Sequence, residues 1–240
     1  MADFYNGFMN FRENGLISPY YDYHMPFSVA IPLLVAIAVI SYLLGNINFA
    51  VIISKKKFHE DVRNFGSGNG GLTNMMRNYG KGAAAMTLVG DLSKAFVAVW
   101  LGISLMGTMG GYIAGLFCII GHCFPVFLGF HGGKGVATTA MTILCLSPSV
   151  FIILFTIFVL LVLGYKYISL GAIMCMLLSP VVLSMIKGYG YWNIIAILIA
   201  LIVIFMHREN AKRLLNRTES KFEFRKKGDR NGENAENSEK

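Results

Sequence analysis

The chain has 240 residues and a net charge of +8; 55% of its residues are hydrophobic and only 14% are charged. Soluble domains carry about 25% charged residues, so this composition excludes an ordinary soluble globular domain. The basic excess selects no ligand by itself, because membrane topology and anionic lipids favour it too.

Long apolar stretches follow one another along the chain. They cover residues 27–54, 83–106, 111–130, 136–163, 168–186 and 192–206. Most approach or exceed the ~20 residues needed to cross a bilayer, and backbone in lipid must satisfy its own hydrogen bonds, which favours helices. The runs are continuous rather than alternating, unlike a membrane barrel. The expected fold class is all-α, in a polytopic integral membrane protein.

The distribution of basic residues predicts the topology. Lysines and arginines cluster in residues 55–81 and again in 208–227. Positive segments stay in the cytoplasm, so the number of crossings between them must be even. Splitting the stretch 136–163 at Ser147-Pro148-Ser149 makes it even, because proline cannot continue the helical bond pattern. We predict about seven transmembrane helices, some short, with the N-terminus outside and the C-terminus cytoplasmic. An alternative with five membrane spans, in which one segment lies on the membrane surface, also has an odd number of crossings and leaves the two termini on the same sides.

Two glycine-rich stretches lie at the edges of apolar segments. Residues 66–74 read Gly-Ser-Gly-Asn-Gly-Gly-Leu-Thr-Asn and are followed by Arg77, and residues 132–135 read Gly-Gly-Lys-Gly. Glycines let backbone N–H groups converge on an anion, and a neighbouring cation supplies the opposite charge. The two loops therefore predict a site for phosphate-like groups at the membrane surface.

Simpler interpretations exist for both loops. Clusters of Gly, Asn and Ser commonly form turns and caps, and the simpler interpretation of Lys134 is a lysine that extends to the interface. Arg77, however, is expected just past a helix cap at Thr73 or Asn74. There a cation opposes the helix dipole by a few tenths to ~1 kcal/mol unless an anion is bound. Lys134 similarly precedes the free N–H groups of the helix expected near 136. Neither loop is a nucleotide P-loop, since Lys134 is followed by Gly135.

Polar residues occur at two further places. His207, Asn210 and Leu214 share a helix face after the last apolar stretch. An imidazole beside an amide suits a site for a hydroxyl and a phosphate, although an ordinary interfacial histidine is the alternative. Asp91 and Lys94 are spaced i, i+3 inside an apolar helix, where a charge costs roughly 2.5–3.5 kcal/mol. We predict that they form a structural ion pair bordering the site rather than a catalytic pair.

The motifs join into one long pattern over about residues 28–220. It comprises Asp61-Val-Arg63, Gly66-Ser67-Gly68-Asn69-x-Gly71-x-Thr73-Asn74-x-x-Arg77, Gly121-His122-x-Phe124-Pro125-Val126-Phe127-Leu128, Gly132-Gly133-Lys134-Gly135-Val136-Ala137-Thr138 and His207-x-x-Asn210-x-x-Arg213-Leu214, then Glu219. The pattern closely resembles the acyl-phosphate-dependent glycerol-3-phosphate acyltransferases (PlsY family) of bacterial membranes. Small departures occur at Leu72, Ala95, Ala172 and Arg217.

The resemblance implies transfer of a fatty acyl group from acyl phosphate to the 1-hydroxyl of glycerol 3-phosphate. The products are lysophosphatidic acid and inorganic phosphate, in the first step of phospholipid synthesis. It also implies a seven-helix protein of the bacterial plasma membrane with a cytoplasmic active site. The implied partners are both substrates, membrane lipid and the enzyme that produces acyl phosphate, with no nucleic acid.

The same resemblance assigns the residues of the site. The catalytic residues are Ser67, Arg77, Lys134, His207 and Asn210. The substrate- and phosphate-binding residues are Gly66, Gly68, Asn69, Gly71, Thr73, Asn74, Gly132, Gly133, Gly135 and Ser169. The supporting residues are Asp91, Lys94 and Glu219. Arg77 and Lys134 would neutralise the two phosphates, and His207 is a candidate base.

Neither a metal nor a cofactor is expected. No set of carboxylates and histidines has metal-binding spacing, and the cysteines lack a CxxC pair and all lie in apolar stretches, as packing residues do. The cysteines are Cys118, Cys123, Cys145 and Cys175.

Two other functions are compatible with parts of the pattern. A transporter for an organic phosphate would also be polytopic and would bind anions, but its broken helices should meet near the midplane. An acyl-CoA or acyl-carrier-protein acyltransferase would need a His-x4-Asp motif, and no histidine of this chain has one.

The expected domain organisation has three parts. Residues 1–26 contain charges but no apolar centre, so they are no signal peptide and form an extracytoplasmic segment. Residues 27–207 form the transmembrane acyltransferase domain with cytoplasmic active-site loops. Residues 208–240 form a basic cytoplasmic tail that is largely disordered after 220, because it is rich in Lys, Glu, Asn and Gly.

Overall fold

A computed structural model describes residues 2–17 and 25–222 of the chain, and these ranges contain helices and no strand, which confirms the all-α prediction. The predicted disorder after 220 concerns residues that lie mostly outside this described part. The helices are α1 (Ala2–Asn14), α2 (Phe27–Asn46), α3 (Phe49–Phe58), η2 (Val62–Asn64), α4 (Leu72–Cys123), η3 (Val126–Leu128), α5 (Val136–Leu146), α6 (Pro148–Tyr165), α7 (Ile168–Lys187), α8 (Tyr191–Met206) and α9 (Arg208–Leu215).

Helix α4 is a hairpin of two antiparallel arms. Its backbone leaves helical geometry at Gly80 and again at Met106 and Gly107. A Cβ on Gly102 would lie 2.3 Å from the carbonyl oxygen of Gly110, although eight helical residues span about 12 Å at 1.5 Å each. The chain therefore reverses at Met106–Gly107, between the predicted stretches 83–106 and 111–130.

The first apolar stretch is broken, which the sequence analysis did not predict. Residues 27–54 were expected to form one run, but α2 ends at Asn46 and α3 begins at Phe49. Asn48 makes the new start possible, because its side-chain oxygen accepts the N–H of Val51 at 3.0 Å. The polar pair Asn46 and Asn48 inside an apolar run was the signal for this break.

The predicted split of residues 136–163 is confirmed. Helix α5 ends at Leu146 after 11 residues, and Pro148 occupies the first turn of α6, where its missing N–H costs nothing. At about 16 Å, α5 is much shorter than the ~30 Å hydrocarbon core. Arg12 donates to the carbonyls of Cys145 and Leu146 at 2.8 and 3.0 Å, and Lys187 donates to that of Leu146 at 3.1 Å. These side chains satisfy the end of the short helix.

Several helices have the length and composition of membrane spans. In the described part, four helical segments qualify, or five if α8 and α9, which bend by 60°, are counted together. Their outward faces expose large apolar side chains, such as Val35, Leu160 and Leu201, as expected for surfaces that contact lipid. The protein is an integral membrane protein.

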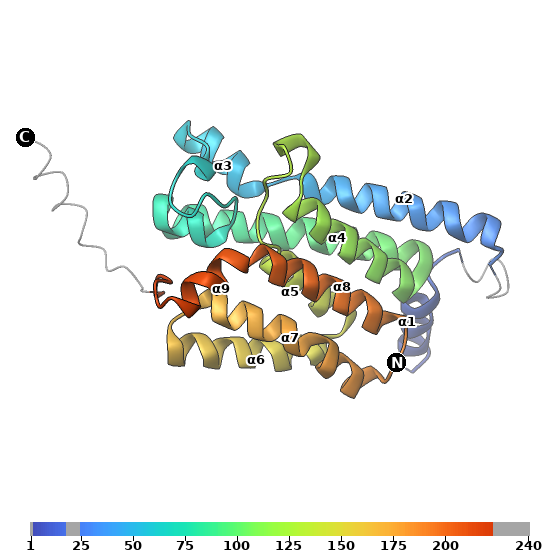
Figure 1. The fold of residues 1–240 in the computed structure, drawn as a ribbon. Coiled ribbons are helices and arrows are strands. Elements are labelled where there is room, and N and C mark those ends of the chain that lie inside the picture. The colour runs from blue at the N-terminus through green and yellow to red at the C-terminus, as the bar shows by residue number, and fades with distance from the viewer. Residues whose placement is uncertain (1, 18–24, 223–240) are drawn as a thin grey trace, which may run out of the picture.

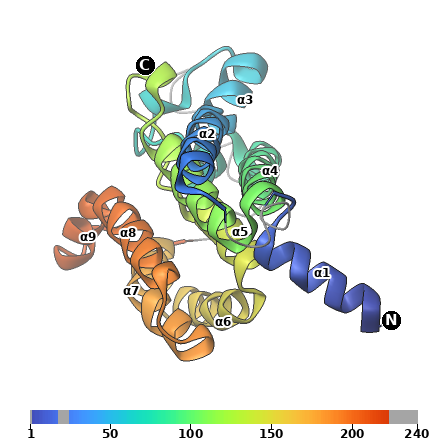
Figure 2. The same cartoon turned by 90° about the vertical axis from the view of Figure 1, so that its right-hand side faces the viewer.

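The helices form two groups with α5 between them (Figures 1 and 2). One group holds α1 to α4, and the other holds α6 to α9. Figure 1 places α3 and α9 near one end of the bundle and α1 at the opposite end. Helix α1 packs on the hairpin turn of α4, where Leu16 donates to the carbonyl of Ser104 at 2.9 Å.

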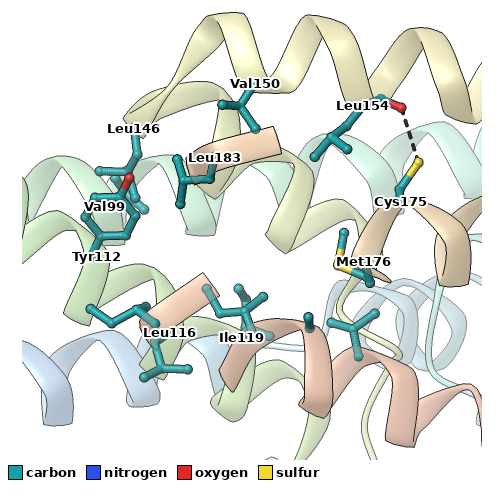
Figure 3. Close-up of a cluster of buried hydrophobic side chains, with 14 of the residues drawn as sticks. Val99, Tyr112, Leu116, Ile119, Leu146, Val150, Leu154, Cys175, Met176 and Leu183 are labelled. Carbon is teal, nitrogen blue, oxygen red and sulfur yellow. Dashed lines mark hydrogen bonds between the residues drawn. The ribbon is translucent and has the colours of Figure 1, made fainter. Parts of the chain in front are cut away.

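The main core joins the second arm of α4 to α5–α8. Figure 3 shows Leu116 and Ile119 of α4 on one side, with Leu154 of α6 and Met176 of α7 on the other. The thiol of Cys175 donates to the carbonyl of Leu154 at 3.2 Å. Cys118, Cys123 and Cys175 are buried free thiols, in agreement with the predicted packing role.

Candidate active site

The two glycine loops lie against each other at the end of the bundle that carries α3. The N–H of Gly70 donates to the carbonyl of Gly132 at 3.3 Å. Arg63 donates to the carbonyls of Leu128 and His131 at 3.0 and 3.1 Å. Its guanidinium also binds Asp61 at 2.8 Å, and this hydrogen bond lowers the pKa of Asp61 to about 2. The sequence-distant loops therefore form one unit.

Asn74 holds the first loop from inside. Its side chain is buried; Oδ1 accepts the N–H of Ser67 at 3.0 Å, and Nδ2 donates to the carbonyls of Val62, Phe65 and Asn69. The two N–H groups of Nδ2 are thus shared among three carbonyls, and Oδ1 also accepts from Nδ2 of Asn78 at 3.1 Å. Asn74 therefore shapes the first loop, and its predicted role in phosphate binding stays a prediction.

The start of α4 also differs from the prediction. Gly71, and not Thr73 or Asn74, is the N-cap residue, so the predicted cap was wrong by two to three residues. Arg77 consequently lies in the second turn of α4 rather than in the first. It remains exposed and faces the site cavity.

The second loop uses its first two glycines for close packing. The N–H groups of Gly132 and Gly133 donate to the carbonyls of Cys123 and His122 at 3.3 and 3.0 Å, so they are not available to a phosphate as predicted. A Cβ on Gly133 would lie 2.1 Å from Nε2 of His122. Gly135, with a φ of +79°, is the N-cap of α5. The free donors of this loop are therefore those of the first turn of α5.

Similar packing explains Gly66 in the first loop. It has a φ of +59°, and a Cβ there would lie 2.4 Å from Oδ1 of Asn74. Gly66, Gly68, Gly132 and Gly133 do not line the cavity described below. They shape the loops, and their predicted contact with substrate stays a prediction.

The third motif contacts the second loop directly. Asn210 lies on α9 and is buried; its Oδ1 accepts a hydrogen bond from Nζ of Lys134, and its Nδ2 donates to Oε1 of Glu219 at 2.6 Å. Glu219 also accepts from Ser169 at 2.7 Å and from Nε of Arg213 at 2.7 Å. Four predicted residues thus form one hydrogen-bonded chain, and Glu219 orients the amide of Asn210.

Burial sets the protonation of the polar groups. It lowers the pKa of Lys134 to about 8, although Glu219 opposes this effect. It lowers the pKa of His207 to about 4, so the imidazole is neutral near pH 7. Nδ1 of His207 lies 2.8 Å from the carbonyl oxygen of Val203. A carbonyl only accepts, so Nδ1 carries the proton and Nε2 has a free lone pair.

A cavity of about 2170 Å³ joins this polar end to an apolar side. Helices α4, α5 and α7 all begin at its polar end, and free N–H groups at helix starts attract anions. Its apolar side is formed by α4, α5, α6 and α7, and includes Met141, Leu144, Phe151, Phe155 and Phe158. The space can hold an anionic group and an alkyl chain together.

Most predicted site residues line this cavity. They are Ser67, Asn69, Gly71, Thr73, Asn74, Arg77, Asp91, Lys134, Gly135, Ser169, His207, Asn210 and Glu219. The predicted ion pair is confirmed, with Lys94 Nζ 3.0 Å from Oδ1 of Asp91 and both side chains buried. Within residues 2–17 and 25–222, no group of three His, Cys, Asp or Glu residues is arranged to hold a metal ion.

Arg213, Lys81 and His122 are among the cavity residues that the sequence analysis did not assign to the site. Arg213 follows Asn210 by three positions, so helical spacing would have placed it on the same side. Lys81 and His122 also line the cavity. His122 offered no local signal, because its partners Asp91 and Lys94 are about 30 residues away and only the hairpin brings them close.

The fold and the site together define a class: a polytopic helical membrane protein whose glycine loops lie at the polar end of a cavity with an apolar side. The family model described as "Glycerol-3-phosphate acyltransferase" matches residues 35–217. The chain belongs to this glycerol-3-phosphate acyltransferase family, as its motifs indicated.

Similar proteins agree with this assignment. The glycerol-3-phosphate acyltransferase of Syntrophomonas wolfei is 44% identical, over 78% of this chain and 96% of its own. That of Neisseria meningitidis serogroup B is 42% identical, over 76% and 94%. The crystal structure of PlsY (YgiH), an integral membrane glycerol 3-phosphate acyltransferase, in its glycerol 3-phosphate form matches with a TM-score of 0.75 and 34% identity, over 79% of this chain and 96% of that chain. Its lysophosphatidic acid form matches with a TM-score of 0.72 and 33% identity.

Proposed function

We propose that this protein transfers a fatty acyl group from acyl phosphate to the 1-hydroxyl of glycerol 3-phosphate. The products are lysophosphatidic acid and inorganic phosphate. The observation that carries the proposal is the single cavity in which Lys134, Arg77 and Asn210 lie at one end of a long apolar wall. Substrates with phosphate headgroups and one alkyl chain match both halves of this cavity.

The chemistry needs positioning more than covalent help. The glycerol hydroxyl attacks the acyl carbonyl carbon, the acyl–oxygen bond to phosphate breaks, and phosphate leaves with the electron pair. Two phosphates repel each other, so the charges of Arg77 and Lys134 would lower the barrier to bringing them together. Ser67, Asn69 and the free N–H groups of α4 and α5 would donate hydrogen bonds around the reacting carbonyl.

The proton of the hydroxyl would go to a phosphate oxygen. A phosphate monoester has a second pKa of about 6, whereas the pKa of His207 is about 4, so phosphate is the stronger base. Nε2 of His207 can still accept a hydrogen bond and orient the hydroxyl. Ser67 is assigned no covalent step.

The proposed site faces the cytoplasm. Supporting this topology, the chain has seven apolar helical segments in succession: α2, the two arms of α4, then α5, α6, α7 and α8. If each of these segments crosses the membrane once, we infer that the N-terminus lies outside and that both glycine loops, Ser169 and α9 lie inside. An enzyme that makes acyl phosphate would work at the same face, because this anhydride reacts with water.

The test uses the purified protein in detergent with acyl phosphate and glycerol 3-phosphate, and it measures released phosphate and lysophosphatidic acid. Arg77→Ala and Lys134→Ala, tested separately, should each lower kcat/KM about 100-fold, as removal of one transition-state donor does in other sites. Lys134→Ala should raise KM chiefly for glycerol 3-phosphate. Lys212→Met, an exposed matched lysine on α9, should change neither constant.

Three results would contradict the proposal. Unchanged turnover in both alanine variants would remove the anion pocket. Activity with acyl-CoA but none with acyl phosphate would assign another acyltransferase class. No release of phosphate from acyl phosphate of any chain length would favour a transporter for an organic phosphate.

A further inference from the structure

A buried polar cluster lies between the two arms of α4, under the glycine loops. Lys94 and Asp91 come from the first arm and His122 from the end of the second; their side chains are only 2%, 3% and 5% exposed. Nζ of Lys94 lies 3.0 Å from Oδ1 of Asp91 and 2.8 Å from Nδ1 of His122. Burying such charges costs several kcal/mol per ion unless the geometry compensates, so the arrangement calls for a physical reason.

The ammonium of Lys94 uses all three of its N–H groups. They donate to the carbonyls of Gly45 and Ile47 at 3.1 and 2.6 Å and to Nδ1 of His122, while Asp91 supplies the opposite charge. Because an ammonium can only donate, Nδ1 must hold the lone pair, and we assign the proton of His122 to Nε2. Lys94 therefore fixes both the tautomer and the orientation of the imidazole.

One side of this cluster leads to the first glycine loop. Gly45 and Ile47 lie at the break between α2 and α3, where carbonyls have lost their helical donors. The next residue, Asn48, donates from Nδ2 to the carbonyl of Gly70 at 3.1 Å. The N–H of Gly70 in turn donates to Gly132. The ammonium thus holds the backbone that carries Asn48.

The other side leads to the second loop. The carbonyl of His122 accepts the N–H of Gly133 at 3.0 Å, and the ring packs so closely on Gly133 that a Cβ there would lie 2.1 Å from Nε2. Lys134 is the next residue. The position of the His122 ring therefore sets the position of the backbone from which Lys134 extends.

We propose that Lys94 is a positioning residue for the binding of glycerol 3-phosphate: one buried ammonium joins the α2–α3 break to His122 and so holds the loop of Lys134 against the loop of Ser67. The inference rests on the proposed function and deepens it. Lys94 itself does not line the cavity, so it acts through His122 and not on the substrate.

Kinetics separate positioning from simple stabilisation. A variant that is only less stable has fewer folded molecules, which lowers apparent kcat but leaves KM unchanged. A displaced loop weakens phosphate binding in every folded molecule. The first variant is Asp91→Asn/Lys94→Met, which leaves no unpaired buried charge. Its KM for glycerol 3-phosphate should rise about tenfold. This is less than the ~100-fold loss of rate that a misplacement of 1 Å can cause, because the loop keeps its other contacts.

The second variant guards against failure of the first to fold. In His122→Asn, the side-chain oxygen can still accept from Lys94, but no ring packs on Gly133. This variant should keep its helical circular dichroism and also show a raised KM for glycerol 3-phosphate. Lys212→Met is the control and should match the wild type. Isothermal titration with glycerol 3-phosphate alone should show the same loss of affinity.

The outcomes are distinct. A wild-type KM and affinity in His122→Asn, or in a folded double variant, would overturn the positioning role and leave a structural ion pair. Inactive wild-type protein would contradict the proposed function instead, since the comparison of variants requires active wild-type enzyme.

Discussion

At the scale of single residues, the site depends on a chain of polar groups with fixed directions. Glu219 accepts from the amide nitrogen of Asn210, which leaves the amide oxygen to accept from Lys134. Reversal of this amide would place an N–H donor against an ammonium. Glu219 therefore acts on the cation through Asn210, and its own pKa stays below its usual value because hydrogen bonds from Asn210, Ser169 and Arg213 outweigh burial.

The pKa of Lys134 predicts how activity depends on pH. The side chain carries its charge below about pH 8 and loses it as the pH rises through that value. Because kcat/KM reports the free enzyme, kcat/KM for glycerol 3-phosphate should fall above about pH 8. The measurement is a pH profile from 6 to about 10 at constant ionic strength.

Two variants check whether Lys134 causes the fall in kcat/KM above about pH 8, which is the alkaline limb of the pH profile. Lys134→Arg should remove it, because an arginine with a pKa above ~12 stays charged throughout. Glu219→Gln should move the limb to lower pH, since Glu219 supports the charge on Lys134. An unchanged limb in Lys134→Arg would show that another group titrates.

At the scale of elements, the hairpin of α4 makes the site possible. It brings His122 to Lys94, 28 positions earlier in the chain, and it places two apolar arms side by side. The turn depends on Gly107, with φ +59° and ψ −152°, a region that is essentially restricted to glycine. A Cβ there would also lie 2.0 Å from the carbonyl oxygen of Glu13 in α1.

Gly107→Ala should therefore destabilise the protein. The backbone strain alone is about 1–3 kcal/mol, and the contact with Glu13 adds to it. Gly82→Ala is the matched control in the same helix, because no atom lies within 4 Å of its added Cβ; it should be neutral or stabilise by about 0.5–1 kcal/mol. Unfolding followed by circular dichroism in detergent measures both, and equal stability of the two variants would contradict the role of the turn.

The sequence predicted those elements that leave a local signal. Pro148 marked the division between α5 and α6, and the apolar run ended near Met106 as predicted. The break at Ile47 was missed, because the two asparagines that mark it do not by themselves end a helix and the other stabilising group, Lys94, is nearly 50 residues away. The glycine loops were recognised as a site, but the sequence could not show that Gly132 and Gly133 already use their N–H groups within the chain.

At the scale of the whole molecule, the polar groups collect at one end of the bundle and the apolar wall of the cavity extends away from them. Exposed apolar side chains cover the outside. An alkyl chain can lie along this wall while its phosphate stays at the polar end. The sequence predicted many of the polar residues at this end, but not the cavity, because the wall combines α4 to α7.

Accessibility from the two sides of the membrane tests this arrangement. Cysteines introduced by Asn64→Cys and His131→Cys, both at exposed positions of the two loops, should react with an impermeant thiol reagent only from the cytoplasmic side. Tyr189→Cys, at a residue 92% exposed between α7 and α8, should react only from outside. The natural cysteines are buried or half-buried, which limits the background. Reaction of the two loop positions from opposite sides would exclude a shared pocket.

The N-terminal helix contributes to the fold from outside the range that the family model matches. Helix α1 precedes the range shared with the family, 35–217, yet Arg12 provides two of the three side-chain hydrogen bonds at the end of α5. Without Arg12, the carbonyl of Cys145 would lose its side-chain donor and that of Leu146 would keep only Lys187. A helix outside the matched range thus completes the end of the short helix α5.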